Sequence, residues 1–386
     1  MDEKINIALV IKTDGLEYDD RVRKEIFSVQ KLYPNIRFKI FVILHENKVI
    51  EDVTSYGVSY KSIYIPARDR YPSASHTTLK AWQFYKAVKN EVRDFDAIWC
   101  ACVETGFIAM LLPNRKILWD LHELPKTFLS NRIKRLLLKY IFRRCKVILH
   151  TNPQRIHHLE QLGVVKEPSK HFYLRNFPDF DDVDKEYDTG YQKFIDWKGQ
   201  RKCVYLQSLG SDARAAYESV SAVLRQKDLC AVIVGGFDKK AENRIRNEYT
   251  DFDERIYLAG KILQLKIPQY IRQCYMSLIF YKRINSGKGI ENNWYCEANR
   301  FYQSVIMGLP VVVGANPTMK EFVDKYQFGV VIDDDGSDIS KISDGIHKVL
   351  EHYEFYYQNS IKYRDNLIWN QQAPQIKVII DKLFSN

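Results

Sequence analysis

Short apolar runs alternate with amphipathic stretches along most of the chain. In the first half these runs are INIALVI (Ile5–Ile11), RFKIFVIL, DAIWCACV, KILWDLH and KVILHTN, and helix-length segments separate them. Continuous apolar strands joined by helices are typical of a parallel sheet that is covered on both faces. The pattern therefore predicts a doubly wound α/β fold.

The alternation stops once, between Asn176 and Arg201, where the sequence is acidic, aromatic and poor in periodicity. We interpret this stretch as the connection between two domains. The pattern then starts again with KCVYLQSLG, CAVIVGG, RIYLAG, MSLIFY, PVVVG and GVVID. Two similar domains are expected at residues 1–185 and 200–365, with a ligand site in a cleft between them. Residues 366–386 are expected to form a helix that returns to the first domain.

Composition and charge narrow the class of protein. Of the 386 residues, 46% are hydrophobic and 27% are charged, which is ordinary for a globular protein. The sequence has no run apolar enough to span a bilayer and no layout of a secretion signal, so a cytoplasmic location is expected. Seven scattered cysteines without a C-x-x-C pair favour reduced thiols over a zinc site. The net charge of +10 indicates an anionic partner.

The segment NRIKRLLLKYIFRRCK, residues 131–146, is basic and amphipathic. Its apolar stripe at helical spacing consists of Ile133, Leu137, Tyr140 and Ile141. Such helices lie on anionic membrane surfaces, so one interpretation is peripheral attachment to the inner face of the plasma membrane. A core-packed helix with a solvated basic face is the alternative. Nucleic acid is not expected as a partner, because no recognisable binding module accompanies the cations.

The segment SLGSDARAAY follows the first strand of the second half. Gly210 permits close approach of the backbone to a ligand, and Ser211 or Asp212 can cap the next helix. Arg214 is expected in the first turn of that helix, where free N–H groups and a cation suit a phosphate. A capped turn without a ligand is the alternative.

The segment NRFYQSVIMGLPVVV predicts a helix followed by a buried strand. Asn299 is the expected N-cap, and Gly308 ends the helix. Arg300 and Gln303 lie near the helix start, where an anion would gain from the helix dipole and from the arginine charge. A capped helix with a solvated first turn is the alternative.

Two further motifs come from the first half. WDLHELP ends a strand with His122 and Glu123, and open α/β sheets bind their ligands at the carboxyl ends of strands. This polar pair is therefore a candidate site. YDDRVRKEIFSVQKL begins a helix, and Arg21 and Arg23 are expected only to belong to a charged first turn.

In their order along the chain, these segments resemble the motifs of the retaining family 4 glycosyltransferases (GT4), which have the GT-B fold. DDRVRKEIFSVQKL is similar to the family's D-x-R-V-x-x-E helix, WDLHELP to its D-x-H-E segment, and LRNFPDFD to its N-x-P turn. YLAG resembles the strand before the base-binding loop, EANRFYQSVIMGLPVVV looks like x-P-N-K-x-x-E-x-x-x-x-G-x-P-V-V, and NLIW resembles a late tryptophan segment. The resemblance spans nearly the whole chain. It implies two Rossmann-like domains facing a central cleft, and transfer of a sugar from a nucleotide sugar to an acceptor.

The resemblance also implies roles for individual residues. The nucleotide-sugar site would consist of Gly210, Ser211, Arg214, Lys261, Asn299, Arg300 and Gln303. Within it, Arg214 and Arg300 would stabilise the leaving diphosphate, and Lys261 would lie near the base. His122 would hydrogen-bond the donor sugar, while Glu123 would orient His122 or contact the acceptor. The donor would be a UDP- or GDP-sugar, configuration would be retained, and no metal or other cofactor would be needed.

The sequence departs from the family pattern at two positions. Gln303 and Tyr295 occupy the positions of the family's two glutamates, of which the second grips the ribose hydroxyls. A glutamine accepts at its carbonyl but donates from its amide, so it would hold ribose differently. The expected function is glycosyl transfer to a glycan or lipid-linked acceptor in cell-surface polysaccharide biosynthesis, for example of capsule. A sugar-nucleotide epimerase of the same fold and a catalytically degenerate scaffold subunit are the alternatives.

Overall fold

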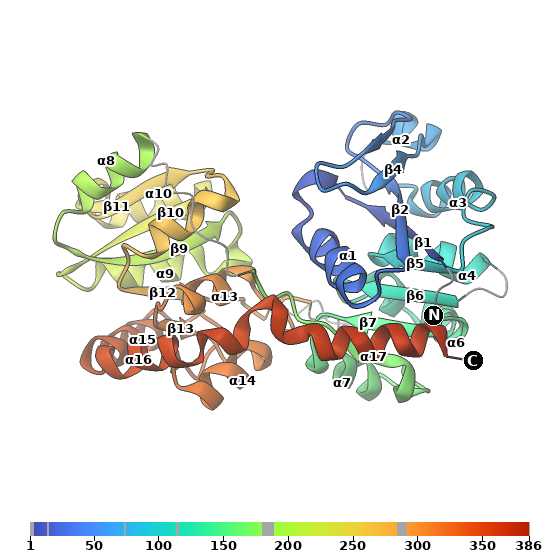
Figure 1. Cartoon of the computed structure of the whole chain (residues 1–386). Helices are drawn as coiled ribbons and strands as arrows, with labels where there is room; N and C mark the ends of the chain where they lie inside the picture. Colours follow the sequence, from blue (N-terminus) through green and yellow to red (C-terminus); the bar gives the residue numbers. More distant parts are fainter. Residues whose placement is uncertain are drawn as a thin grey trace. The chain divides into compact units, whose positions relative to one another are not determined.

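The chain forms two compact units, each with its own sheet (Figure 1). The computed structural model describes residues 4–13, 15–72, 75–112, 116–179, 189–283 and 292–385. The first unit holds Met1–Asn176 and Gln372–Asn386, and the second holds Phe177–Gln371. Both sheets are mostly parallel and carry helices, so the doubly wound α/β prediction is confirmed. None of the described helices has the length and apolar character needed to cross a bilayer.

The sheet of the first unit has eight strands in the order β3-β4-β2-β1-β5-β6-β7-β8, and only the β3–β4 pair is antiparallel. Its strands are β1 (Ile5–Lys12), β2 (Ile36–Ile43), β3 (Glu51–Val53), β4 (Ser59–Ser62), β5 (Ala97–Ala101), β6 (Lys116–Leu121), β7 (Val147–His150) and β8 (His171–Tyr173). Strands β5 and β7 are buried along their whole length, as their apolar runs predict. Strand order reverses at the β1–β5 pair, so the carboxyl ends of these strands mark the switch point of the sheet.

The helices of the first unit pack in two groups. They are α1 (Asp20–Leu32), α2 (Pro66–Arg70), α3 (Thr77–Val88), α4 (Gly106–Leu111), α5 (Lys126–Leu129), α6 (Arg132–Arg144), α7 (Pro153–Gln161) and α17 (Ala373–Phe384). Helix α17, the last of the chain, packs against α1, β6 and β7. Helices α3, α4 and α6 pack side by side. Right-handed crossovers place α4 and α6 on the opposite face of the sheet from α1.

The sheet of the second unit is parallel throughout, in the order β11-β10-β9-β12-β13-β14. Its strands are β9 (Lys202–Leu209), β10 (Leu229–Phe237), β11 (Ile256–Gly260), β12 (Met276–Ile279), β13 (Val311–Val313) and β14 (Gly329–Val331). Numbered within the unit, this is the order 3-2-1-4-5-6 of a Rossmann fold. The switch point therefore lies at the carboxyl ends of β9 and β12.

Helices cover both faces of this second sheet. They are α8 (Thr189–Lys198), α9 (Ala216–Leu224), α10 (Lys239–Glu248), α11 (Phe252–Arg255), α12 (Ile267–Ile271), α13 (Asn299–Ile306), α14 (Pro317–Tyr326), α15 (Ile339–Glu351) and α16 (Tyr353–Tyr363). Alternate residues of β9 join different cores, because side chains of a strand point to alternate faces. Val204 and Leu206 pack with α9 and α15, whereas Cys203 and Tyr205 pack with α8 and α12.

The connections between the units differ from the expected boundaries. The first unit ends at Asn176 rather than at residue 185, and the return begins at Gln372 rather than at residue 366. Trp369 stays with the second unit, where its N–H donates to the carbonyl of Pro178 (2.9 Å). The Gln372 amide then donates to and accepts from the main chain of Arg175, both at 2.6 Å. Within the expected connection, residues 180–188 lie outside the described residues, and α8 follows them.

Candidate functional site

Arg300 lies at the switch point of the second sheet. It sits in the first turn of α13, is only 5% exposed, and donates through its guanidinium to the carbonyls of Gln207 and Phe280. Gln207 belongs to β9, and Phe280 directly follows β12. The charged group is therefore fixed at the carboxyl ends of the two central strands, where open sheets bind ligands.

Arg214 lies beside the same strand ends. Its Nη1 donates to the carbonyl of Ser208 at 2.8 Å. The Tyr281 ring lies 5.8 Å from the guanidinium carbon of Arg214 and 5.0 Å from that of Arg300. A cation gains about 0.5–1 kcal/mol or more over a ring face, so Tyr281 helps to keep both guanidinium groups in place.

The two arginines have no ion pair with a carboxylate in the part of the chain that the structure describes. The buried Nε of Arg300 has no acceptor among these residues either. Burial lowers the pKa of Arg300, and the charge of Arg214 lowers it further. Buried charges in proteins are normally paired, because desolvation of an ion is costly. A ligand with two or more negative charges would supply the missing partner.

The turn that carries Arg214 differs from the prediction. Residues 212–214 form a separate 3-10 turn, and α9 begins only at Ala216, so Arg214 precedes the helix instead of lying in its first turn. Ala215 adopts a left-handed conformation (φ 51°) between the two elements, and neither Ser211 nor Asp212 caps α9. Lys282 fixes the turn, because its Nζ lies 2.7 Å from Asp212 Oδ1 and its N–H donates to Ala213.

Helix α13 begins one residue earlier than predicted. Ala298 is the N-cap, so Asn299 is the first helical residue, exposed at the helix start. Gln303 lies one turn after it, and its buried Oε1 has no hydrogen-bond partner among the described residues. Helix α13 ends at Ile306 with Met307 as its C-cap, and Gly308, which was expected at the cap, follows with a positive φ (82°).

Gly210 lies where two loops approach closely. A Cβ on Gly236 would lie 3.7 Å from the Gly210 Cα, so the ends of β9 and β10 run in van der Waals contact. Gly210 and Ser211 are both exposed at this point, beside the turn of Arg214. Lys261 lies apart from them: it is exposed and follows β11, the edge strand of the sheet. The structure thus groups Gly210, Ser211, Arg214 and Arg300 at one switch point.

In the first unit, His122 follows the end of β6 and is held by Asp120. Its Nε2 lies 3.0 Å from Asp120 Oδ2, and its Nδ1 lies 3.7 Å from the sulfur of Cys102, which follows β5. Burial alone would lower the pKa of His122, but the Asp120 carboxylate raises it well above its ordinary value. The Asp120 carboxylate therefore favours the charged form of the imidazole. Glu123 is exposed, so Asp120 fills the orienting role that the sequence suggested for Glu123.

Two residues of α1 complete this network. Arg21 lies 3.2 Å from Asp120 and 2.9 Å from Glu25, and it donates to the carbonyl of Leu174 at 3.1 Å. Arg21 lies in the charged first turn of α1 that the sequence predicted, but it is buried and belongs to this network, as does Glu25, which is 1% exposed. Burial and the Asp120 carboxylate raise the pKa of Glu25 to about 8, which makes it a neutral acid at pH 7.

The same acids could be considered for a metal ion. Glu25, Asp120 and His122 each offer one ligand atom, and these atoms lie within 4.8 Å of one another. The guanidinium of Arg21 already contacts both side chains, at 2.9 Å from Glu25 and 3.2 Å from Asp120. A metal ion would have to displace it, so the arrangement suits the fixing of His122 better than metal binding.

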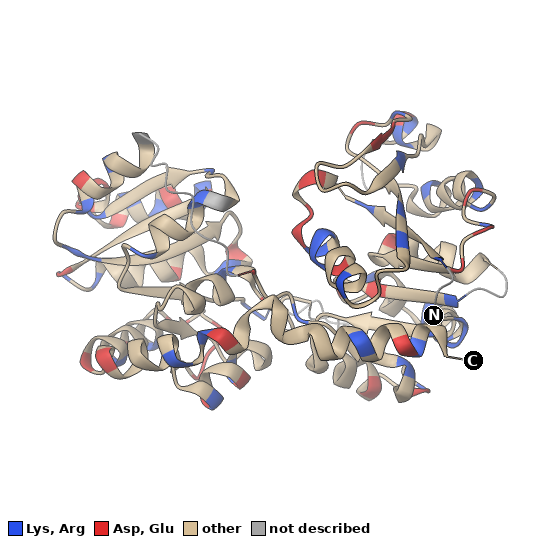
Figure 2. Ribbon diagram, viewed as in Figure 1, with Lys and Arg blue, Asp and Glu red and all other residues tan. Residues whose placement is uncertain are grey.

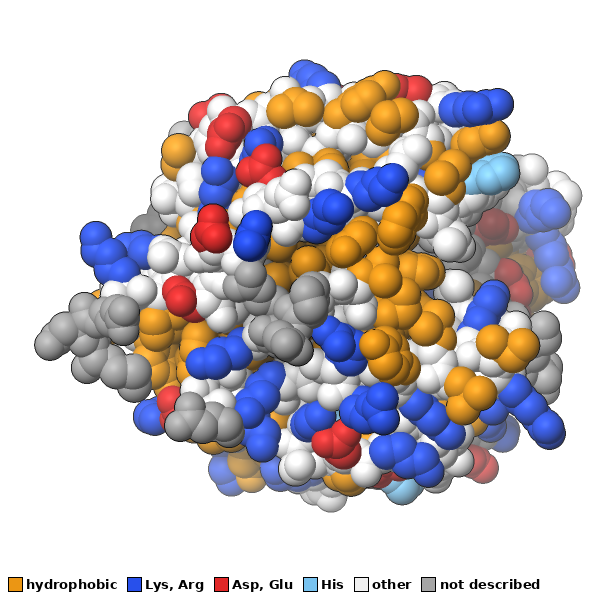
Figure 3. Space-filling model, turned by 90° about the vertical axis from the view of Figure 1, so that its right-hand side faces the viewer, with side chains coloured by type: hydrophobic (Ala, Val, Ile, Leu, Met, Phe, Trp, Pro, Cys, Tyr) orange, Lys and Arg blue, Asp and Glu red, His pale blue; other side chains and the backbone are white. Residues whose placement is uncertain are grey.

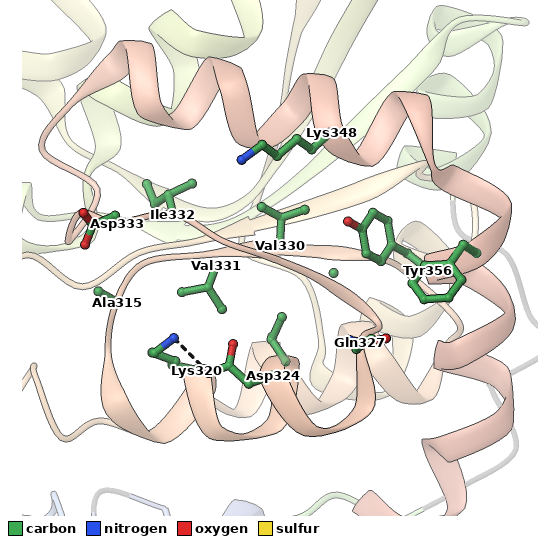
Figure 4. Close-up of a pocket in the computed structure, with 13 residues that line it drawn as sticks. Ala315, Lys320, Asp324, Gln327, Val330, Val331, Ile332, Asp333, Lys348 and Tyr356 are labelled. Atoms are coloured by element: carbon green, nitrogen blue, oxygen red, sulfur yellow. Dashed lines mark ion pairs between the residues drawn. The ribbon is translucent and has the colours of Figure 1, made fainter.

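A large cavity of about 690 Å³ lies elsewhere in the second unit. Residues of α14, β14, α15 and α16 line it, among them Lys320, Val330 and Lys348 (Figure 4). Lys320 forms an ion pair with Asp324 at 2.8 Å. None of the residues that the sequence assigned to the nucleotide sugar contributes to this cavity, and β14 is the edge strand on the far side of β13 from the switch point.

No protein-family model and no curated protein sequence matches the chain. Its structure is similar to that of sucrose-phosphate synthase (tll1590) from Thermosynechococcus elongatus, with a TM-score of 0.75 and 15% identity over 99% of each chain. It is also similar to the trehalose-6-phosphate protein from E. coli bound with UDP-2-fluoro glucose (TM-score 0.72, 10% identity, 99% of each chain). A third similar structure is Anabaena Alr3699/HepE in complex with UDP-glucose (0.67, 11%, 98% of this chain and 99% of that one). These proteins are GT-B glycosyltransferases, and the likeness shows that this chain has the GT-B fold.

Proposed function

We propose that this protein is a glycosyltransferase that moves a sugar from a nucleotide sugar, with UDP-sugars as the first donors to test. The observation that carries the proposal is Arg300, which is buried beside Arg214 at the switch point of the second sheet and has no carboxylate partner among the described residues. A diphosphate has the charge that this pair lacks, and planar guanidinium groups bind phosphate oxygens in a bidentate way. Two of the similar proteins are described with UDP-glucose or its fluoro analogue bound, which supports UDP.

The chemistry of transfer suits these residues. The bond between the sugar C1 and the β-phosphate oxygen breaks, and negative charge grows on that oxygen as it leaves. Arg214 and Arg300 would stabilise this charge, and fixed donors are effective because they need no reorganisation during the reaction. The acceptor hydroxyl bonds to C1, and its proton passes to the leaving phosphate. We infer retention of configuration and independence from metal ions from the family 4 resemblance.

The residues around His122 would act on the sugar and the acceptor. A cationic His122 can only donate hydrogen bonds, so it would donate to a sugar hydroxyl or to a charged group. Glu123, which is exposed, would contact the acceptor. The acceptor would be a glycan or lipid-linked intermediate of cell-surface polysaccharide synthesis. A lipid-linked acceptor would require the protein to work at a membrane surface.

Calorimetric titration with UDP, GDP, UDP-glucose and GDP-mannose tests the donor site. Binding of at least one nucleotide, weakened in Arg300→Met, is the expected result. If no nucleotide or nucleotide sugar binds to the folded wild type, the transferase proposal fails and a degenerate scaffold subunit is favoured. A glutamine at the position of the family glutamate, whose Oε1 has no partner in the described ranges, is the observation that keeps this alternative open.

A sugar-nucleotide epimerase differs from a transferase in one measurable respect. An epimerase converts the donor without any acceptor, whereas a transferase releases free nucleotide only when an acceptor or water takes the sugar. Incubation of the protein with the bound nucleotide sugar alone, followed by chromatography of the nucleotide products, separates the two activities.

A further inference from the structure

Helix α6 has two apolar faces rather than one. Leu138, Ile141 and Phe142 are buried against the first unit. On the other side, Ile133 is 80% exposed, Leu136 is 64% exposed and Tyr140 is half-exposed. The stripe expected from the sequence was therefore wrong: Ile141 belongs to the core face, and Ile133 and Tyr140 belong to the outer face.

The outer face of α6 continues over its neighbours. Helix α6 packs on α4, and α4 packs on α3, where Leu79 and Trp82 are also exposed. Figure 3 views this side of the first unit and shows hydrophobic side chains gathered in a band, with Lys and Arg side chains along it. We call the exposed surface of α3, α4 and α6 the basic–apolar face.

Charge on the basic–apolar face has a single sign. Helices α3, α4 and α6 contain no aspartate and no glutamate (Figure 2). Their cations are Lys80, Lys86, Arg132, Lys134, Arg135, Lys139, Arg143 and Arg144. None of the cations of α6 forms an ion pair with a carboxylate in the described part of the chain.

The cations are arranged beside the outer apolar residues. At 100° per residue, Arg132, Lys139 and Arg143 follow one side of the stripe formed by Ile133, Leu136 and Tyr140. A cavity of about 290 Å³ opens at the same edge, lined by the cations Lys139, Arg143 and Lys166 and by one acid, Glu167. Lys170 pairs with Glu167 at 2.9 Å, so the cations of the lining remain in excess. An anionic headgroup could enter this cavity while the apolar side chains face the acyl chains.

We propose that the basic–apolar face docks on a bilayer that contains anionic phospholipids. Exposed leucine and isoleucine, interfacial Trp82 and Tyr140, and cations with long stems are the combination that surface-lying helices use. A protein partner fits less well, because protein interfaces are depleted in lysine, and this face presents lysine without acids. The anionic leaflet attracts such basic surfaces through its uniform negative potential. The inference goes beyond the proposed transferase and rests on the first unit alone.

Flotation of the full chain with lipid vesicles tests docking without donor or acceptor. The protein should float with vesicles of phosphatidylcholine and phosphatidylglycerol, should stay behind with phosphatidylcholine alone, and should be released by salt. Ile133→Ser/Leu136→Ser and Arg132→Gln/Lys139→Gln/Arg143→Gln should each lower the partition coefficient at least about tenfold. The changed side chains are exposed, apart from the half-buried Lys139, and thermal unfolding checks that the fold is kept.

The matched controls carry the same types of substitution at exposed positions outside the basic–apolar face. Val49→Ser removes an exposed apolar residue of the same unit, and Lys227→Gln/Lys240→Gln/Lys325→Gln removes equal charge from the second unit. Both should float like the wild type.

Docking is refuted if the wild type does not float, if it floats equally with neutral vesicles, or if controls and variants lose binding alike. Binding that survives Ile133→Ser/Leu136→Ser but not the charge variant would show adsorption to any polyanion and would overturn docking. Nucleotide binding, measured separately, reports on the transferase site alone.

Discussion

The Nε2 of His122 lies 3.0 Å from the Asp120 carboxylate, which precedes it by two residues on the same face of the strand end. Asp120 is fully buried and is fixed in turn by Arg21. This arrangement favours the charged imidazole and holds it at both nitrogens, because Nδ1 lies 3.7 Å from the Cys102 sulfur. A ligand that takes a hydrogen bond from Nδ1 must therefore replace the contact with Cys102.

Substitution of His122 tests its role in turnover. We expect His122→Ala to lower kcat at least about tenfold, which corresponds to about 1.4 kcal/mol of lost transition-state stabilisation. The melting temperature and the nucleotide affinity should remain close to those of the wild type. His157→Ala, at an exposed position of α7 in the same unit, is the control and should change neither value. Wild-type activity of His122→Ala would remove His122 from the site.

Asp120→Asn keeps the imidazole of His122 but removes the carboxylate that favours its charged form. The variant therefore tests whether the charge of His122 matters for activity. Without the carboxylate, burial would lower the pKa of His122, so the imidazole would be neutral at pH 7 and charged only in more acidic solution. Activity of this variant should be low at neutral pH and should recover, relative to the wild type, as the pH falls. A constant ratio of the two rates across the pH range would contradict a role for the charge.

Arg300→Met should weaken UDP binding at least about tenfold, because a hydrogen bond to a charged group contributes about 1.5–3 kcal/mol. Calorimetric titration with UDP measures the loss. Arg255→Met is a matched control, since Arg255 also donates to several main-chain carbonyls, including those of Leu224 and Leu229. That variant should lower the melting temperature but should leave UDP affinity unchanged in the folded protein. Equal losses of affinity in the two variants would point to a general folding defect.

Gln303→Glu restores the residue that the family resemblance places at this position. The Gln303 Oε1 has no hydrogen-bond partner in the described structure, so a carboxylate there is free to accept from the ribose hydroxyls. We expect UDP affinity to be kept or improved, and Gln303→Leu to reduce it. Abolished binding in Gln303→Glu would mean that the amide donates to the ligand and that ribose is held in another way.

Glu25 gives the first unit a pH-dependent stability. Its folded pKa of about 8 exceeds its ordinary value of about 4.3, so the folded state keeps a proton that the unfolded state releases. Its contribution is complete below the ordinary pKa and is lost as the pH rises through about 8. We therefore expect the melting temperature to fall between about pH 5 and pH 9.

Glu25→Gln should reduce that decline, because its amide is neutral at every pH. Some slope should remain, since the raised pKa of His122 acts in the same direction. Glu51→Gln is the control: the hydrogen bond from Lys39 lowers the pKa of Glu51, so its titration ends at lower pH. Circular dichroism melts at a series of pH values give the comparison. Identical slopes in wild type and Glu25→Gln would show that Glu25 is not the titrating group.

The sequence predicted strands better than helix ends. Runs such as INIALVI became β1 because a fully buried parallel strand needs apolar residues on both faces. Asn299 has a strong capping preference, but Ala298 is the N-cap and Asn299 is the first helical residue. Arg214 lies before α9 because Ala215, the N-cap of that helix, has a left-handed backbone conformation. No pattern in the sequence predicts that conformation for an alanine.

Burial explains the remaining errors. An arginine and a glutamate four residues apart look alike on a solvated helix and in a buried network, so Arg21 and Glu25 could not be told from surface residues. The D-x-H spacing was the available signal for Asp120. In α6, apolar residues occupy two faces, and periodicity alone does not say which of them meets the core.

Helix α17 makes the first unit depend on the order of synthesis. The strands of this unit leave the ribosome before any part of the second unit, but the helix that covers α1 and β6 is among the last segments made. Domains generally fold as units during synthesis, the N-terminal one first. In this chain the first unit cannot complete its fold until the second unit has been synthesised, because α17 is still missing from the surface of α1 and β6. We therefore expect the second unit, which is continuous in sequence, to be the first to reach its complete fold.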